Sequence, residues 1–160
     1  METLDTNLPG GYLLQGPRHS YRLDACLGKG GFGITYVGWD IALERKVAIK
    51  EYYPSGQVSR NPGSRDLTWY TNEQSRQARQ NGMQMFLKEA RKMSKVDNLT
   101  NVVRVRDIFQ ENETAYIVMD FIEGETLQQK MQKNGPMDFD SCIRLCLLYT
   151  SPSPRDRSLS

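Results

Sequence analysis

The sequence predicts an α+β fold in which an antiparallel sheet comes first and helices follow. Three observations support this prediction. Runs of β-branched and aromatic residues, separated by glycines and turns, fill residues 21–50. A helical pattern of apolar residues begins at Met83, and two more strand-like runs follow within 102–119. After Gly124 the chain turns to polar helical segments.

Length and composition limit the chain to one domain and exclude several kinds of partner. The 160 residues carry 21 basic and 19 acidic side chains, a net charge of +2, which gives no reason to expect nucleic acid or an acidic membrane surface. No apolar run approaches the ~18 residues of a membrane span. The first five residues do not form a signal peptide. Three cysteines without a disulfide-framework spacing fit a reducing compartment, so we expect a cytoplasmic protein.

The first strands of the predicted sheet flank a glycine-rich segment. Residues 1–20 form a lead-in with one small strand near 12–14, and a longer strand covers 21–27. That strand runs into Gly28-Lys29-Gly30-Gly31-Phe32-Gly33. Because 34–37 is again β-branched and aromatic, the chain leaves the glycines as a second strand, and a third strand follows at 46–50.

The spacing of Gly28, Gly30 and Gly33 occurs in more than one kind of nucleotide site. A dinucleotide-binding fold would need a helix directly after the glycines and an acidic residue ~20 positions later. Here a strand follows, and no Gly-Lys-Ser/Thr sequence supports a Walker A loop. Two interpretations remain: a glycine-rich turn whose backbone N–H groups approach phosphates, or a glycine-rich hairpin without a ligand.

Lys50 and Glu89 are the candidate charged residues of the site. Alternation along the third strand puts Lys50 and Ala48 on one face, where the small alanine leaves room for a flat ring. A lysine that ends a buried strand needs an anionic partner. Glu89, at the edge of the apolar stripe of its helix, is a candidate partner. The alternatives are a lysine that reaches the surface and a glutamate on the solvated helix face.

The remaining elements follow from pattern and capping residues. Residues 51–81 form a polar insertion or long loop, whose end is compatible with a helix, and a helix covers 83–96. The runs within 102–119 form a hairpin, and a polar helix covers 126–133. Asp138 caps a last helix.

Together these motifs resemble the small lobe of a eukaryotic-type protein kinase, with wording similar to bacterial Ser/Thr kinases. Val47-Ala48-Ile49-Lys50 matches the valine-alanine-isoleucine-lysine motif of that family, and Glu89 matches its helix-C glutamate. Residues 116–124 resemble the fifth strand and hinge, whereas Thr35 stands where valine is more usual. The resemblance implies a five-stranded antiparallel sheet plus helix C, then the hinge and the start of a truncated helical large lobe.

The resemblance also divides the chain. It implies a lead-in at 1–20, a small lobe with hinge at 21–124 and the start of the large lobe at 125–145. Residues 146–160 are rich in serine, proline and arginine toward their end and do not continue the last helix. We therefore expect them to be a non-native tail.

The activity that the resemblance implies is transfer of phosphoryl from Mg-ATP to serine or threonine hydroxyls of protein substrates. Lys50 would hold the phosphates and Glu89 would orient Lys50, so these two are the expected catalytic residues. Met119 would be the gatekeeper. The expected ATP contacts come from the glycine-rich segment, the third strand and the hinge: Leu27, Gly28, Lys29, Gly30, Gly31, Phe32, Gly33, Ile34, Thr35, Ala48, Lys50, Met119, Asp120 and Ile122.

The catalytic loop and the Asp-Phe-Gly motif of the family, which hold Mg²⁺ and orient the substrate, do not occur in the sequence. Asp107 and Asn112 have the spacing of the catalytic loop but precede the hinge, so we expect an ordinary strand and turn there. The chain itself should therefore be inactive. The alternatives are a pseudokinase-type module that binds ATP or docks proteins, and a structural fragment of poor stability.

Overall fold

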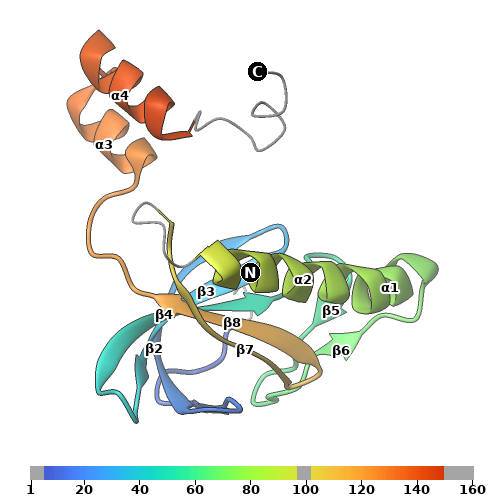
Figure 1. The fold of residues 1–160 in the computed structure, drawn as a ribbon. Helices are drawn as coiled ribbons and strands as arrows, with labels where there is room; N and C mark the ends of the chain where they lie inside the picture. Colours follow the sequence, from blue (N-terminus) through green and yellow to red (C-terminus); the bar gives the residue numbers. More distant parts are fainter. Residues whose placement is uncertain (1–5, 97–101, 150–160) are drawn as a thin grey trace, which may run out of the picture. The chain divides into compact units, whose positions relative to one another are not determined.

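The structure, a computed structural model, describes residues 6–96 and 102–149. It divides into two compact units, residues 1–121 and 122–160. The first unit contains the sheet and the helices that pack on it, and the second unit contains two further helices (Figure 1).

A six-stranded antiparallel sheet is the centre of the first unit, with strand order β1-β2-β3-β4-β8-β7. The five predicted strands are present, and the small strand of the lead-in joins them as the sixth by pairing with β2. The strands are β1 (Leu13–Gln15), β2 (Ser20–Gly30), β3 (Gly33–Asp40), β4 (Arg45–Tyr52), β7 (Val105–Glu111) and β8 (Thr114–Asp120).

Strand β4 shows why the sheet has two different faces. Val47 and Ile49 are fully buried, whereas Lys50 is exposed, which confirms the predicted alternation. The face with Val47 and Ile49 belongs to the main apolar core, together with Leu8, Leu14, Tyr21, Leu23, Ile34, Tyr36, Phe109, Tyr116 and Val118. A second cluster, around Tyr52, Leu87 and Ala115, joins the sheet to the long helix.

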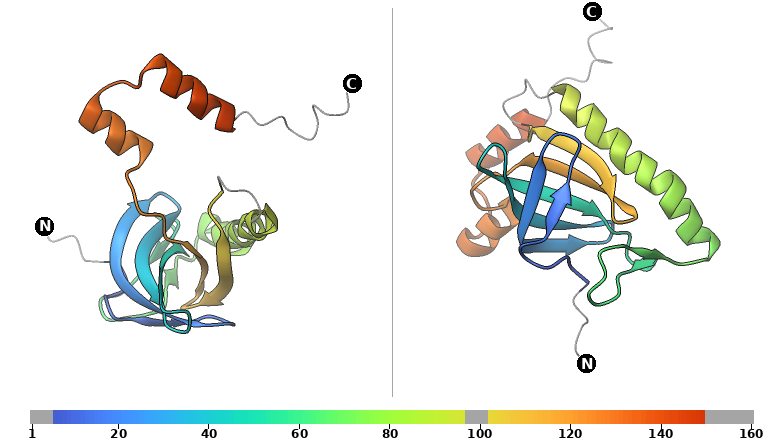
Figure 2. Two further views of the ribbon diagram at one scale, coloured as in Figure 1. Left: turned by 60° about the vertical axis from the view of Figure 1, so that its left-hand side comes forward. Right: turned by 90° about the horizontal axis from the view of Figure 1, so that it is seen from below.

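The insertion after β4 folds more than its polar sequence predicts. It forms a two-stranded sheet of β5 (Val58–Ser59) and β6 (Thr68–Trp69). Helix α1 (Glu73–Gln77), a π-helical turn (Ala78–Gly82), α2 (Met83–Met93) and a 3₁₀ turn (Ser94–Val96) then follow without interruption. Figure 2 shows this continuous helical segment, residues 73–96, alongside the sheet, with β5 and β6 next to its first turns. Its start is capped by Asn72, whose side chain accepts a hydrogen bond of 2.8 Å from the N–H of Ser75.

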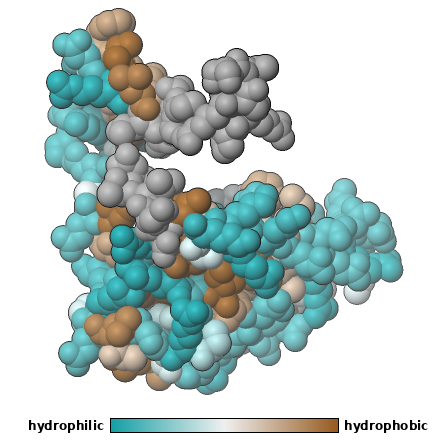
Figure 3. All heavy atoms as spheres, in the orientation of Figure 1, coloured by the Kyte–Doolittle hydropathy of each residue, from teal (hydrophilic) through white to brown (hydrophobic). Residues whose placement is uncertain are grey.

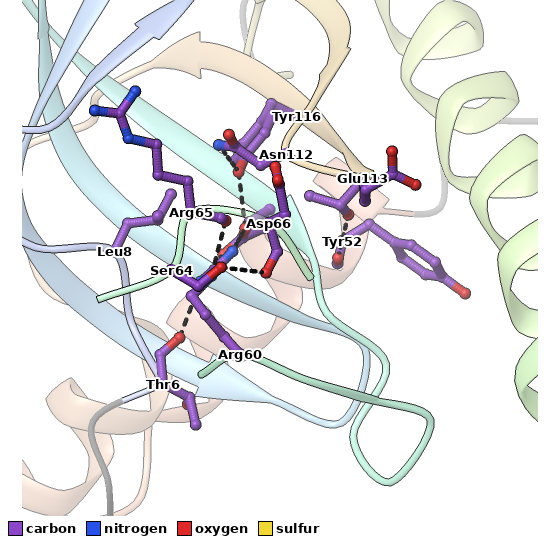
Figure 4. A network of polar contacts seen from close by, with 12 residues as sticks. Thr6, Leu8, Tyr52, Arg60, Ser64, Arg65, Asp66, Asn112, Glu113 and Tyr116 are labelled. Atoms are coloured by element: carbon purple, nitrogen blue, oxygen red, sulfur yellow. Dashed lines mark hydrogen bonds and ion pairs between the residues drawn. The ribbon is translucent and has the colours of Figure 1, made fainter. Parts of the chain in front are cut away.

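A buried polar network anchors the insertion and the lead-in to the sheet (Figure 4). Arg60, from the insertion, forms an ion pair with Glu51 of β4 and donates hydrogen bonds to the carbonyl oxygens of Thr6 (2.9 Å) and Arg65 (3.1 Å). Tyr116 of β8 also donates to Glu51, at 2.8 Å. Residues far apart in the sequence are thereby joined, so the insertion is an integral part of this unit.

The second unit contains α3 (Leu127–Asn134) and α4 (Phe139–Tyr149). Asp138 caps α4, as predicted, by accepting a 3.0 Å hydrogen bond from the N–H of Ser141. The helix continues through residues 146–149, the first part of the expected tail, and residues 150–160 lie outside the described residues. Within the described ranges, every helix is too short or too polar to cross a membrane.

Candidate functional site

A hollow of about 410 Å³ lies between the glycine-rich turn and Lys50. The glycine-rich turn is residues 28–33, which form the end of β2, the connection and the start of β3. Lys50 reaches the hollow from β4, so three consecutive strands build it. Its lining residues are Gly28, Lys29, Gly30, Gly31, Phe32, Gly33, Thr35 and Lys50. Eight of the residues expected from the sequence to contact ATP are therefore adjacent in space.

Three of the glycines in this turn have no role in the packing of the fold. A Cβ added to Gly28 or Gly31 would meet no described atom within 4 Å, and one added to Gly30 would meet a single oxygen at 3.9 Å. None of the three has the positive φ that favours glycine. What these positions provide is an open wall of bare backbone, which suits the approach of an anionic ligand to N–H groups.

Gly33 differs, because the fold itself needs it. A Cβ at this position would lie 2.6 Å from the carbonyl oxygen of Glu51 and 3.4 Å from Cε of Lys50. The backbone of β3 thus passes close to β4 at the point where Lys50 leaves the sheet. Gly33 brings the turn and the lysine together.

The turn is also tied to the chain that follows β4. The carbonyl oxygen of Phe32 accepts a hydrogen bond from the N–H of Tyr53 (3.1 Å), and that of Gly31 accepts one from the N–H of Ser55 (2.9 Å). Nζ of Lys29 donates to Oγ1 of Thr6 at 2.9 Å. These contacts hold the turn while the side chain of Phe32, 77% exposed, extends into solvent.

The sheet register collects the other expected residues on one face. Thr35 lies opposite Lys50, and Ala48 lies opposite Met119, as cross-strand partners. Opposite residues in neighbouring strands share a face, so these four side chains belong to the same side of the sheet. Ile34 does not: its side chain is buried in the main core, which leaves only its backbone near the site.

Lys50 lies against an aromatic ring of α2. Its Nζ is 5.9 Å from the centroid of the Phe86 ring. Glu89 is exposed one turn further along the helix, and the described residues contain no ion pair between it and Lys50. The structure therefore brings Lys50 to the glycine-rich turn but not to Glu89. Phe86, which the sequence placed only in the apolar stripe, is the unexpected neighbour of Lys50.

Asp120, at the end of β8, is held in place by hydrogen bonds of its side chain and its backbone. Nε and Nη2 of Arg106 donate to its two carboxylate oxygens at 2.6 and 2.8 Å, and its N–H donates to the carbonyl oxygen of Arg104 at 3.0 Å. The hydrogen bonds from Arg106 hold the pKa of Asp120 below its ordinary value. Of the other expected contacts, Leu27 is half exposed in β2, and Ile122 is an exposed residue of the second unit.

Asp107 and Asn112 have structural roles, as expected. Asp107 is buried in β7 and accepts a 2.8 Å hydrogen bond from the hydroxyl of Tyr21. Asn112 occupies the β7–β8 turn with a positive φ of 54° and donates to the hydroxyl of Tyr116 at 3.0 Å. The spacing that resembles a catalytic loop is therefore a strand followed by a turn.

Comparison with known proteins gives one consistent family. The sequence profile of the protein kinase domain matches residues 21–147. Serine/threonine-protein kinase PrkC of Bacillus subtilis is 33% identical over 117 residues, which cover 73% of this chain and 15% of the relative. Serine/threonine-protein kinase B of Synechocystis is 29% identical over 119 residues, 72% of this chain and 17% of the relative.

Solved structures agree with these relatives. The apo form of PpkA-294 superposes with a TM-score of 0.74 at 31% identity, over 88% of this chain and 48% of that one. The kinase domain of PknI from Mycobacterium tuberculosis, at 15% identity and a TM-score of 0.61, shares the fold. The chain thus spans about half the length of these solved proteins and a much smaller part of the curated relatives.

Proposed function

The chain belongs to the protein kinase family, and from that premise we propose that it carries the ATP-binding small lobe of a protein serine/threonine kinase. The observation that carries this proposal is the open wall of Gly28, Gly30 and Gly31 beside Lys50, at glycines where an added Cβ would have no close contact. A glycine-rich hairpin without a ligand would not require this composition.

Each part of the proposed site has a distinct task. Bound ATP would supply the phosphoryl group that the whole kinase transfers to a protein hydroxyl. The bare backbone of the turn would face its phosphates, and Lys50 would add the positive charge that neutralises them. Ala48 and Met119, side by side on the same face, would border the adenine ring. Asp120, fixed by Arg106, would start the hinge.

Phosphoryl transfer needs residues that these 160 positions do not include. The sequence contains no Asp-Phe-Gly and no His-Arg-Asp, the family motifs that hold Mg²⁺ and orient the substrate hydroxyl. Among the described residues, no group of three acidic, histidine or cysteine side chains could hold a metal ion. We therefore assign nucleotide binding to this chain, and transfer to protein substrates to a complete kinase domain in the cytoplasm.

Thermal unfolding of the 160-residue chain with and without Mg-ATP tests the proposal. A ligand that binds only the folded state stabilises it by about 2.7 kcal/mol at a concentration 100 times its Kd, so the unfolding midpoint should rise. Lys50→Met should lose this rise. Lys92→Met is the matched control, because Lys92 is an exposed lysine of α2 that does not line the hollow, and it should keep the rise. Equal responses of the two variants, or no response of the wild type, would contradict the proposal.

One observation favours the second candidate, a module that binds nucleotide without catalysis. Lys50 lies beside Phe86, and Glu89 is exposed. The two candidate functions can be distinguished in a longer protein in which this chain is followed by a catalytic loop and an Asp-Phe-Gly motif. Phosphorylation of a generic protein substrate by that protein supports the kinase, and nucleotide binding without phosphorylation supports the module.

A further inference from the structure

The helix that carries Phe86 and Glu89 docks on the sheet through Tyr52 and Gly82. Tyr52 is the buried last residue of β4, and its hydroxyl donates a 3.0 Å hydrogen bond to the carbonyl oxygen of Ala78. A Cβ added to Gly82 would overlap the same hydroxyl oxygen. Because Gly82 has an ordinary helical φ of −65°, the glycine is needed for space and not for backbone freedom.

Both contacts fall on the π-helical turn Ala78–Gly82. There the N–H of Met83 donates to the carbonyl oxygen of Ala78, five residues back, so the turn accommodates one extra residue. The preceding helix is held independently, because Oγ of Ser75 donates to Oε1 of Gln57 at 2.8 Å. The extra residue therefore changes the register of α2, which follows the turn.

This register decides which side chains of α2 face the sheet. A shift of one residue in the register rotates a helix about its axis by about 100° and moves it along that axis by about 1.5 Å. In the structure, Leu87 and Ala90 are buried and Glu89 is exposed. If the same sequence formed a regular α-helix in place of the π turn, Glu89 would point in the direction that Ala90 has now. Phe86 would then point in the direction that Leu87 has now.

Phe86 connects this register to Lys50. Its ring centroid lies 5.3 Å from that of Tyr52 and 5.9 Å from Nζ of Lys50. The Lys50 side chain also passes Gly33. Lys50 therefore lies near both the glycine-rich turn and the Phe86 ring, and that ring packs against Tyr52, the residue that meets Gly82.

We propose that Tyr52 and Gly82 are positioning residues, a size-matched pair that sets the register of α2 and thereby seats Phe86 against Lys50. The inference rests on the proposed function in one respect, the assignment of Lys50 to the nucleotide phosphates. Neither residue lines the hollow at the glycine-rich turn, so both act through Phe86.

The experiment compares Gly82→Ala, Tyr52→Phe, the double variant and Asn81→Ala in the 160-residue chain. Asn81 is the exposed neighbour of Gly82 in the same turn and serves as the matched control. The first readout is the rate at which an amine-reactive ester acylates Lys50, measured by peptide mass spectrometry, with the exposed Lys92 of α2 as internal reference. The second is the rise of the unfolding midpoint with Mg-ATP.

In Gly82→Ala, Phe86 should leave Lys50, so that Lys50 is acylated severalfold faster than in the wild type while Lys92 is unchanged. The rise with Mg-ATP should shrink. The double variant should return both readouts to those of Tyr52→Phe, because Tyr52→Phe removes the oxygen that the new Cβ overlaps and leaves Cζ, at 3.2 Å, as its nearest Tyr52 atom, which a shift of a few tenths of an ångström accommodates. Asn81→Ala should match the wild type. If Gly82→Ala does not fold, a double variant that folds and shows the Lys50 rate of Tyr52→Phe supports the pairing.

Two results would overturn the inference. One is a Gly82→Ala variant of lower stability whose Lys50 rate is that of the wild type, since the pair would then have a structural role only. The other is a double variant no better than Gly82→Ala, whether folded or not. Acylation needs no nucleotide. If the variants show the expected acylation rates of Lys50 but the wild-type chain does not respond to Mg-ATP, the positioning role is supported and the proposed function is contradicted.

Discussion

Glu51 forms a buried ion pair with Arg60, which reaches it from the insertion that follows β4. The two side chains are 0% and 2% exposed. Removing two charges from water is costly, and the network offsets this cost with further hydrogen bonds to both partners. Tyr36 and Tyr116 donate to Glu51 at 2.9 and 2.8 Å, and burial followed by the charge of Glu51 raises the pKa of both phenols. The phenols stay neutral donors as a result.

Loss of one partner should therefore destabilise the first unit strongly. We expect Arg60→Met to lower the free energy of unfolding by about 3–5 kcal/mol, because it leaves Glu51 buried without its counterion. Urea unfolding monitored by circular dichroism measures this. The double variant Glu51→Gln/Arg60→Met should lose less than Arg60→Met alone. A double variant as unstable as the sum of the two single variants would show that the residues are not coupled.

The Asp120–Arg106 contact predicts a pH dependence. The pKa of Asp120 is lowered in the fold from its ordinary value of 3.8, chiefly by the hydrogen bonds from Arg106. The stabilisation is therefore present above pH 3.8 and is lost as the pH falls through the lower pKa of the folded state. Asp120→Asn should be less stable than the wild type at pH 7, and the difference should close in urea titrations below pH 3.8. The exposed Asp24→Asn is the control and should show little difference at either pH.

Two glycines of the same turn should respond differently to a methyl group. Gly33→Ala pushes a Cβ against the backbone of Glu51, and we expect a loss of about 1–3 kcal/mol in the free energy of unfolding. Gly31→Ala meets open space and should leave that free energy nearly unchanged. Parallel urea titrations compare the two. Equal losses would mean that Gly31 has a role in the fold, which would weaken the argument for the open wall.

Asp107→Ala separates the structural role of this residue from the catalytic role that its spacing imitates. Loss of the acceptor leaves the buried hydroxyl of Tyr21 without its partner, so the free energy of unfolding should fall by about 1–3 kcal/mol. The rise of the unfolding midpoint with Mg-ATP should persist. If stability is unchanged and the response to Mg-ATP disappears, Asp107 belongs to the nucleotide site.

Much of the sheet could be predicted from the local sequence pattern, as could the glycine-rich turn and Lys50 of the candidate site. The alternation that put Val47 and Ile49 on one face of β4 and Lys50 on the other holds in the structure, and the cap at Asp138 is present. The same alternation points Glu51 into the core. A charged residue in that position was a signal that a buried partner had to exist, although it did not identify Arg60.

Local pattern could not predict how the insertion and α2 meet the sheet. The helical periodicity of 83–96 is compatible with Glu89 near Lys50. In the structure, the contact of Tyr52 with Gly82, across 30 positions of chain, falls on the π turn that precedes α2, and Phe86 is the residue near Lys50. Periodicity reports which residues of one element share a face. The rotation of that element against its neighbour depends on the shape and polarity of side chains that meet only in the folded chain, and in this protein the tertiary structure decided it.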